Sequence, residues 1–230
     1  MPALKAVLFD GGNTLLDLDY PWLTKLARRL GAADPTPEAI GRAGARLMRQ
    51  RSLRYGRTPA RQDAQAVFEE SFSAIAAELG LSPMAAAEFA RRAHLEDREH
   101  PQGLWRCPAP GALATLSALR ARNLHLGVIS NSGGKVEAHL GLAGLADYLD
   151  LVIDSSQVGV EKPDPAIFRL ALAQLGLSSH EAVYVGDLLD IDCAGARGAG
   201  LTPYLYDPYD VYPDVEEQRV RALRELLDHF

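Results

Sequence analysis

The chain has 230 residues, 47% of them hydrophobic, and a formal net charge of -6 at pH 7. This length is enough for one large domain, or for a core domain with a smaller one, and the acidic balance argues against general binding to nucleic acid. No apolar segment approaches the ~20 residues that span a bilayer, and the first residues lack the apolar region of a signal peptide. We therefore expect a cytoplasmic globular protein without a membrane partner.

Two cysteines, Cys107 and Cys193, lie far apart and form no CxxC pattern. This usage fits a reducing compartment and argues against a zinc site or a disulfide framework. We expect both to be buried thiols.

Short apolar runs alternate with helical patterns in most of the chain. Five runs have the composition of strands buried on both faces, and they end at Phe9, Ile129, Ile153, Val185 and Tyr206. Helical patterns cover residues 111–122, 165–175 and 190–199. This alternation predicts a parallel, Rossmann-like sheet with crossover helices on both faces.

The long stretch between the first two runs contains no convincing strand. It shows amphipathic helical patterns such as "AVFEESFSAIAAELG", with Gly80 ending one helix and Ser82-Pro83 beginning the next. We predict a core formed by residues 1–18 and 106–230 and an inserted helical cap formed by residues 19–105. The Pro/Gly-rich "HPQGLWRCPAPG" is expected to be the return linker, and the C-terminal "DVEEQRVRALRELLDHF" a last amphipathic helix.

Polar residues follow several of the predicted strands. Asp10 follows the first, Ser130 and Asn131 follow the second, and Gly186-Asp187 follow the fourth. Open α/β sheets bind ligands at the carboxyl edge of their strands, so these groups are expected to gather there. Lys162 adds a cation just before a helix that Asp164-Pro165 would begin. Together they predict a site for one small anion.

Local sequence alone leaves the role of these residues open. In "AVLFDGGNTLLDLD" Asp10 is followed by glycines and an asparagine, which are common turn formers, so it is either a nucleophile or the first residue of a turn. Lys162 could be a surface lysine, and Ser130 a helix-capping serine.

Four motifs in chain order carry a resemblance to a known family. They are "VLFDGGNTLL", "GVISNS", "SSQVGVEKPDPAIF" and "VYVGDLLDIDCAGARGAG". With them the chain resembles the haloacid dehalogenase-like hydrolase superfamily, in its phosphatase-type form with an inserted helical cap. The resemblance covers residues 4–19 and about 108–207, whereas the cap is similar only in position and helical character.

The resemblance assigns roles to the acidic residues. Asp10 would attack phosphorus and form an aspartyl-phosphate, which divides the hydrolysis into two easier steps. Mg²⁺ would bind Asp10, the backbone carbonyl of Gly12, and Asp187. Asp192 would lie close by and bind a metal-coordinated water or Lys162.

The resemblance also implies a phosphate site. Ser130 and the backbone amides of Asn131 and Ser132 would hold phosphate oxygens, helped by the N-terminus of the helix that they precede. Lys162 would neutralise charge on the nucleophile and on the transferred group. For the nearby Asp190 we favour a helix N-cap.

One position departs from the family pattern. Most phosphatases of the superfamily carry a second aspartate, the general acid and base, two residues after the nucleophile, where this chain has Gly12. Such catalysis is worth ~10²–10⁴-fold. One branch with the same D-x-G-N form includes sugar-phosphate phosphatases, so water or another side chain could handle the proton. Alternatively, the chain is a weak or inactive phosphatase kept as a phospho-ligand binder.

A different reaction on the same scaffold is the third interpretation. Dehalogenases of the superfamily need no magnesium, and the retained Asp187 counts against them. Phosphonate hydrolases need a Schiff-base lysine from the cap, where Lys25 is the only candidate.

Specificity is expected to come from the cap, which can close over the leaving group. The candidate contacts are Tyr20, Trp22, Arg46, Arg49 and Tyr55. The seven arginines from Arg42 to Arg61, with no acid among them, either attract an anionic substrate or form a solvated helix face. His94 and His100 are either exposed histidines or replacements for the missing acid.

These observations predict a magnesium-dependent phosphatase acting on a small phosphorylated metabolite. A non-catalytic phospho-ligand binder of the same fold is the alternative. The sequence specifies neither the substrate nor the oligomeric state.

Overall fold

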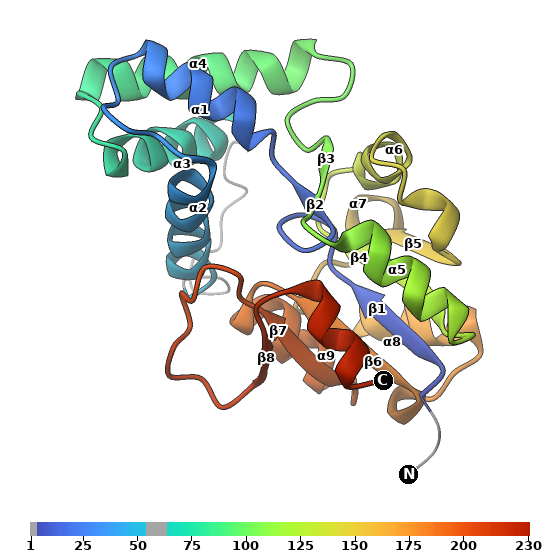
Figure 1. The fold of residues 1–230 in the computed structure, drawn as a ribbon. Helices are drawn as coiled ribbons and strands as arrows, with labels where there is room; N and C mark the ends of the chain where they lie inside the picture. Colours follow the sequence, from blue (N-terminus) through green and yellow to red (C-terminus); the bar gives the residue numbers. More distant parts are fainter. Residues whose placement is uncertain (1–3, 54–63) are drawn as a thin grey trace. The chain divides into compact units, whose positions relative to one another are not determined.

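The computed structural model describes residues 4–53 and 64–230, and it divides into two compact units (Figure 1). The first unit combines Met1–Asp17 with Arg106–Phe230, and the second is Leu18–Trp105. The described helices include none that is both long enough and apolar enough to cross a membrane.

The first unit is built on a six-stranded sheet in the order β5-β4-β1-β6-β7-β8, and every neighbouring pair is parallel. Its strands are β1 (Ala6–Phe9), β4 (His125–Ser130), β5 (Leu151–Asp154), β6 (Ala182–Gly186), β7 (Thr202–Tyr206) and β8 (Gln218–Val220). Each of the five predicted strands ends within one residue of the observed end. The predicted parallel α/β fold is confirmed.

Helices connect the strands of this sheet. They are α5 (Ala112–Ala121), α6 (Val136–Leu142), α7 (Ser155–Val158), α8 (Pro165–Leu175) and α9 (Ala194–Gly198). The expected start of α8 is confirmed, because Asp164 Oδ1 accepts the Ala166 N–H at 2.9 Å. Phe168 of α8 packs edge-on against Tyr184 of β6 within a buried apolar cluster. This packing fixes the helix that follows Lys162 onto the sheet.

The predicted C-terminal helix is wrong. Residues 218–220 form the edge strand β8, and Leu223–Asp228 form a 3₁₀ helix. β7 offers an open row of backbone donors and acceptors, and pairing with it satisfies the segment's own backbone groups. Val220 is buried by this pairing, so tertiary contacts override the helical pattern.

A short antiparallel pair replaces part of the predicted linker. β2 (Leu16–Asp17) pairs with β3 (Cys107–Pro108), so residues distant in sequence meet just after the loop that follows Asp10. Cys193 is buried as expected. Cys107 is only half-buried, because it lies in this small pair and not in the main sheet.

The described residues of the second unit form four helices and the loops between them. The helices are α1 (Tyr20–Arg29), α2 (Pro37–Ser52), α3 (Ala64–Glu78) and α4 (Pro83–Glu99). The predicted boundary between its last two helices is present. Gly80 has a φ of +80°, and Ser82 Oγ accepts the Ala85 N–H at 3.3 Å. The unit has its own apolar core, which includes Leu23, Phe72 and Phe89.

Candidate active site

Lys162 is the centre of a buried polar cluster in the first unit. Its Nζ donates to Asp10 Oδ1 at 2.5 Å, to Asp192 Oδ1 at 2.7 Å and to the Tyr184 hydroxyl at 2.9 Å. An ammonium group has three donors, so every N–H of this side chain is used. Burial by itself lowers the pKa of Lys162, but the charges of Asp10 and Asp192 raise it above its usual value. The surface-lysine alternative is therefore wrong.

The ends of β1 and β6 position the two carboxylates. Asp10 follows β1, and its backbone N–H donates to Val185 O of β6 at 2.8 Å. Asp192 lies in a π-helical turn, Leu189–Cys193, and its Oδ2 accepts the Leu188 N–H at 3.0 Å. A Cβ on Gly186 would lie 2.5 Å from Asp192 Cβ, so a glycine is required there for Asp192 to reach Lys162.

Three carboxylates converge at this edge of the sheet. Asp10, Asp187 and Asp192 each offer an oxygen, and these atoms lie within 4.8 Å of one another. Burial raises the pKa of Asp187 well above its usual value, and the charges of Asp10 and Asp192 raise it further. Burial also raises the pKa of Asp10 to about 6, although Lys162 opposes the shift.

This donor set fits a hard divalent cation. Three carboxylates and one ammonium leave two uncompensated negative charges, which is the charge that one divalent ion neutralises. Carboxylate oxygens are the ligands that Mg²⁺ accepts. The raised pKa values of Asp10 and Asp187 come first from burial and then from the charges of the neighbouring carboxylates, and a bound cation would offset that repulsion.

The loop after Asp10 is held tightly by its own backbone. The N–H groups of Leu15 and Leu16 donate to Gly11 O at 3.0 and 2.8 Å, and Asn13 N–H donates to Leu16 O at 2.7 Å. Asn13 has the left-handed φ of +58° in this loop, whereas Gly12 is not among the described glycines with positive φ. The φ angle at residue 12 therefore does not require a glycine.

Ser130 lies beside this loop. It ends β4, which pairs with β1, and a Cβ built on Gly11 would lie 3.2 Å from Ser130 Oγ. The side chain of Asn131 exchanges two 3.0 Å hydrogen bonds with the backbone of Lys162. The structure thus brings Ser130, Asn131 and Lys162 together, as expected of one site.

The helix after Ser130 is separated from it by a short loop. α6 begins at Val136, so residues 131–135 form a loop between Ser130 and the helix. Ser132 Oγ accepts the Val136 N–H at 3.1 Å. This first amide of the helix is therefore already bonded, and the backbone amides expected to bind phosphate, those of Asn131 and Ser132, belong to the loop.

Sequence reasoning missed two residues of this region. Tyr184 is fully buried, and its hydroxyl lies 3.2 Å from both Ile129 O and Asp192 Oδ1, so its single proton serves one of them at a time. Asp154, at the end of β5, accepts hydrogen bonds from the Ser132 hydroxyl, Gly134 N–H and both donors of Ser156. The signal for Asp154 was its place at a strand end, the same signal that identified Asp10.

The expected helix-capping role of Asp190 is wrong. Asp190 lies inside the π-helical turn, whose N-cap position is Leu188. The wider turn shifts the start of the regular helix α9 to Ala194.

Several candidate specificity residues contribute to the packing or ion pairs of the second unit. Tyr20 and Trp22 pack, partly buried, against its apolar core. Arg42 pairs with Glu38 at 2.7 Å and Arg46 with Glu78 at 3.7 Å, which is typical of a solvated helix face. Tyr55, Arg54, Arg57 and Arg61 lie outside the described residues.

The two histidines also belong to the second unit. The ring of His94 lies edge-on to Phe68, with centroids 5.4 Å apart, and its Nε2 is buried without a partner among the described residues. His100 Nδ1 accepts the Gln102 N–H at 3.1 Å at the end of α4. Both side chains are thus part of this unit's own packing and local hydrogen bonding.

The fold and the site define a Rossmann-like α/β hydrolase with an acidic centre at the carboxyl edge of its sheet. Comparison with known proteins gives the family. The chain matches the model of the haloacid dehalogenase-like hydrolases over residues 4–200. It belongs to this family, and the predicted membership in this hydrolase class is confirmed.

Two relatives and one solved structure illustrate the similarity. The chain is 34% identical over 200 residues to a phosphoserine phosphatase of Thermus thermophilus, covering 84% of this chain and 77% of the relative. It is 37% identical over 121 residues to a ribulose-1,5-bisphosphate 5-phosphatase of Halopiger xanaduensis; the match covers 52% of this chain and about half (51%) of that relative. A dehalogenase crystal structure shares the fold, with a TM-score of 0.68 and 22% identity over 100% of this chain and 98% of the other.

Proposed function

We propose that this protein is a Mg²⁺-dependent phosphatase that acts on a small phosphorylated metabolite. The observation that carries the proposal is the position of Asp10, held by Lys162 among three converging carboxylates at the sheet edge. The names of the relatives support phosphate esters as the substrate class, since one is a phosphoserine phosphatase and another a sugar-bisphosphate phosphatase.

In the first step an oxygen of Asp10 attacks the phosphorus atom. A bond forms between this oxygen and phosphorus, and the bond from phosphorus to the leaving oxygen breaks. Lys162 neutralises part of the charge on Asp10 and on the phosphoryl group. Ser130 and the backbone amides of Asn131 and Ser132 donate to the phosphoryl oxygens. The leaving oxygen takes its proton from water, because Gly12 has no side chain to supply one.

In the second step water attacks the phosphorus of the aspartyl-phosphate. The bond between phosphorus and Asp10 breaks, inorganic phosphate leaves, and the carboxylate of Asp10 is regenerated. The water transfers its proton to bulk water or to the departing phosphate. The same phosphate-binding groups hold the phosphoryl group throughout, so both steps use one set of donors.

Asp10, Asp187 and the backbone carbonyl of Gly12 would hold Mg²⁺. Asp192 would act beside them, because one of its oxygens binds Lys162 and the other binds the Leu188 N–H. When bound, the ion would offset the repulsion between the carboxylates and the phosphoryl group.

A non-catalytic phospho-ligand binder is the second candidate, and Gly12 favours it because the usual general acid is missing. The other reactions have less support. A dehalogenase does not need the acidic cluster that surrounds Asp187. A phosphonate hydrolase needs a catalytic lysine, and Lys25 is exposed on α1 of the second unit.

A phosphatase panel tests the proposal. It would contain p-nitrophenyl phosphate, sugar phosphates, nucleotides and phosphoserine, each with Mg²⁺ and with a chelator. We expect turnover that requires Mg²⁺. Binding of phosphate esters without turnover would establish the binder, and equal rates with the chelator would contradict the metal assignment.

A further inference from the structure

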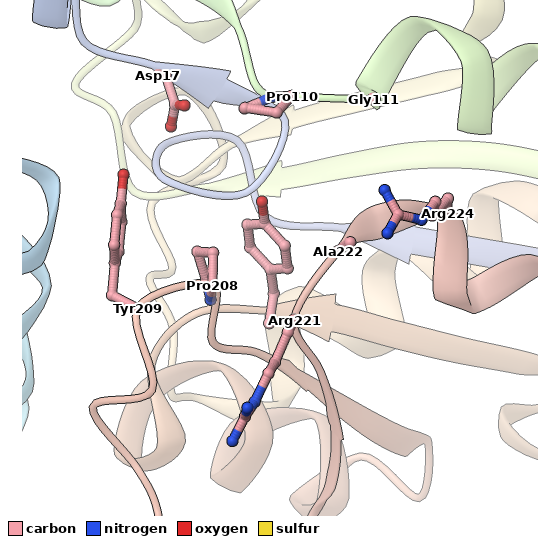
Figure 2. Close-up of a pocket in the computed structure, with 9 residues that line it drawn as sticks. Asp17, Pro110, Gly111, Pro208, Tyr209, Arg221, Ala222 and Arg224 are labelled. Atoms are coloured by element: carbon pink, nitrogen blue, oxygen red, sulfur yellow. The ribbon is translucent and has the colours of Figure 1, made fainter. Parts of the chain in front are cut away.

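A cavity of about 280 Å³ lies in the first unit between β2 and the segments that follow β7 and β8. Figure 2 shows the carboxylate of Asp17 on one side of it and the ring of Tyr209 on another. Its lining also includes Tyr206 and two prolines, Pro110 and Pro208. We call it the Asp17 cavity.

The Asp17 cavity neighbours the acidic centre. Leu205 of β7 is paired with Gly186 of β6, so Tyr206 and Asp187 are the next residues on two adjacent strands, whose backbones are about 5 Å apart. Asp17 ends the short strand that follows the tight loop from Gly11 to Leu16. One wall of the cavity, Tyr206, therefore ends the strand beside the one that precedes Asp187, and another wall, Asp17, follows the loop that comes directly after Asp10.

Two polar groups that line this cavity have no partner in the described part of the chain. Asp17 forms no hydrogen bond or ion pair there, and Figure 2 shows its carboxylate pointing into the cavity. Tyr206 is 4% exposed, and its hydroxyl likewise has no hydrogen bond among the described residues. A carboxylate that is partly buried and has no partner is unfavourable, so this arrangement favours a ligand that supplies the missing partner.

The nearby arginines do not supply that partner. Arg221 pairs with Asp210 at 2.7 Å, and in Figure 2 its guanidinium points away from Asp17. Arg224 forms no ion pair with any residue that the structure describes. Burial raises the pKa of Asp17 to about 6, so at neutral pH the carboxylate is mostly ionised and its charge is uncompensated.

We propose that the Asp17 cavity binds an ammonium group on the leaving alcohol, so that the substrate is the phosphate ester of an amino alcohol or amino acid. The inference rests on the proposed phosphatase function. Asp17 pairs with the ammonium, and the rings of Tyr206 and Tyr209 offer π faces to it. The prolines contact the carbon chain that links the amine to the phosphate. A neutral hydroxyl in the same place would give Asp17 a hydrogen bond without the opposite charge.

Two esters of the same size test this proposal. The specificity constant kcat/KM is measured for 2-aminoethyl phosphate and 2-hydroxyethyl phosphate, with wild type and with Asp17→Asn. We expect wild type to prefer the amine and Asp17→Asn to reduce the ratio of the two constants on the order of 10- to 100-fold, as for a lost charged hydrogen bond. Asp147→Asn is the matched control, because Asp147 is an exposed carboxylate of the same unit.

Each other outcome overturns the proposal. If Asp17→Asn lowers both constants equally, Asp17 serves only the structure. If wild type prefers the hydroxyl ester, the cavity does not select an ammonium. Should Asp17→Asn fail to fold, Tyr209→Leu removes one π face, and an unchanged ratio in that variant contradicts the cation–π contact and with it the proposal.

A binding measurement separates this inference from the proposed function. If no ester is turned over with Mg²⁺, including p-nitrophenyl phosphate, the proposed function has failed. Calorimetric binding of the same two esters then decides about the cavity. Tighter binding of the amine that is lost in Asp17→Asn supports the ammonium site, and equal binding of both esters overturns it.

Discussion

Lys162 organises the site at the scale of single residues. Its three N–H groups bind Asp10, Asp192 and Tyr184, so the orientation of the ammonium is fixed, and one of these bonds holds the carboxylate of Asp10. A buried lysine with unpaired donors would be unfavourable, and the surrounding acceptors remove that cost. If Asp10 is the nucleophile, as proposed, it is therefore positioned before any substrate binds.

We predict that Asp10→Asn abolishes turnover while the protein remains folded. Asparagine has almost the same shape, but its amide does not attack phosphorus. The measurement is the rate on p-nitrophenyl phosphate together with the thermal unfolding curve. Asp147→Asn serves as the control and is expected to keep the wild-type rate. A folded Asp10→Asn protein with a substantial rate would show that Asp10 is not the nucleophile.

Gly12 leads to a second prediction. Without a side chain that protonates the leaving oxygen, the rate should fall steeply as the pKa of the leaving alcohol rises, so aryl phosphates react much faster than alkyl phosphates. Gly12→Asp should then accelerate poor leaving groups most, by up to ~10²-fold, the lower end of general acid catalysis. Gly12 is not among the described glycines with positive φ, so an aspartate there would not be forced into left-handed backbone.

The test is a series of phosphate esters with leaving groups of different pKa, assayed with both proteins. Melting temperatures of the two proteins separate strain from chemistry. The chemical step must first be shown to limit the rate. If the wild-type rate then does not change with the pKa of the leaving alcohol, another acid is present.

Among the larger elements, the loop after β4 is held by the side chain of one residue, Asp154. Asp154 at the end of β5 accepts hydrogen bonds from Ser132, Gly134 and Ser156, and so ties residues 132–134 to the start of α7. This loop follows Ser130 and Asn131, the expected phosphate-binding residues. Asp154 is thus a positioning residue for that site.

We predict that Asp154→Ala lowers the free energy of unfolding by about 2–3 kcal/mol, the range for buried hydrogen bonds to a charged group. The same variant should raise KM for phosphate esters more than it lowers kcat, because the loop is then less ordered before binding. Urea unfolding and steady-state kinetics measure the two effects. Asp147→Asn is again the control, and a stability equal to wild type would contradict the role.

The pH dependence of this contribution follows from the pKa of Asp154. Burial raises that pKa, but the hydrogen bonds from Ser132, Ser156 and Gly134 outweigh it and hold the pKa below its usual value. A lowered carboxylate pKa means that the unfolded chain binds protons more readily in acid. The stabilisation is therefore complete above about pH 4 and is lost as the pH falls through the folded-state pKa.

Unfolding measured at pH 7 and near pH 3 tests the direction of this pH dependence. The difference in stability between wild type and Asp154→Asn should shrink at the lower pH. A difference that stays constant would mean that the charge of Asp154 does not contribute.

At the scale of the whole molecule, the site comes from one of the two units, although that unit is built from two separate stretches of chain. Asp10 lies in the first stretch, and Asp187 and Asp192 in the second, so an ion bound by these carboxylates would link the two stretches. Metal binding should therefore stabilise this unit against unfolding.

We predict that Mg²⁺ raises the melting temperature of the wild type. At ten times its Kd the ion would add about 1.4 kcal/mol of stability, which corresponds to about 3–5 °C for a protein of this size. Asp187→Asn removes an anionic ligand and should shift this response to much higher Mg²⁺ concentrations. Asp147→Asn is the control. If the melting temperature of Asp187→Asn responds to Mg²⁺ at the same concentrations as that of the control, Asp187 is not a ligand.

Much of the fold was predictable because its signals are local. Buried parallel strands are short, continuous apolar runs, and Asp164-Pro165 begins α8 by direct hydrogen bonding and by the fixed φ of proline. The motifs around Asp10, Lys162 and Asp187 are local in the same sense. Strand order then brings them to one edge of the sheet.

Other features depend on partners that are distant in sequence, and only the tertiary structure decided them. Residues 218–220 became a strand because β7 left an edge unpaired, although their own pattern favoured a helix. Tyr184 joined the site through its contact with Lys162, and Asp154 joined it through the loop after β4. The Asp17 cavity exists because β2, β7 and β8 meet there. Sequence by itself determined most of the elements and the candidate site residues at the strand ends, because their signals lie within a few residues. Long-range packing determined which polar groups are satisfied and which remain without a partner.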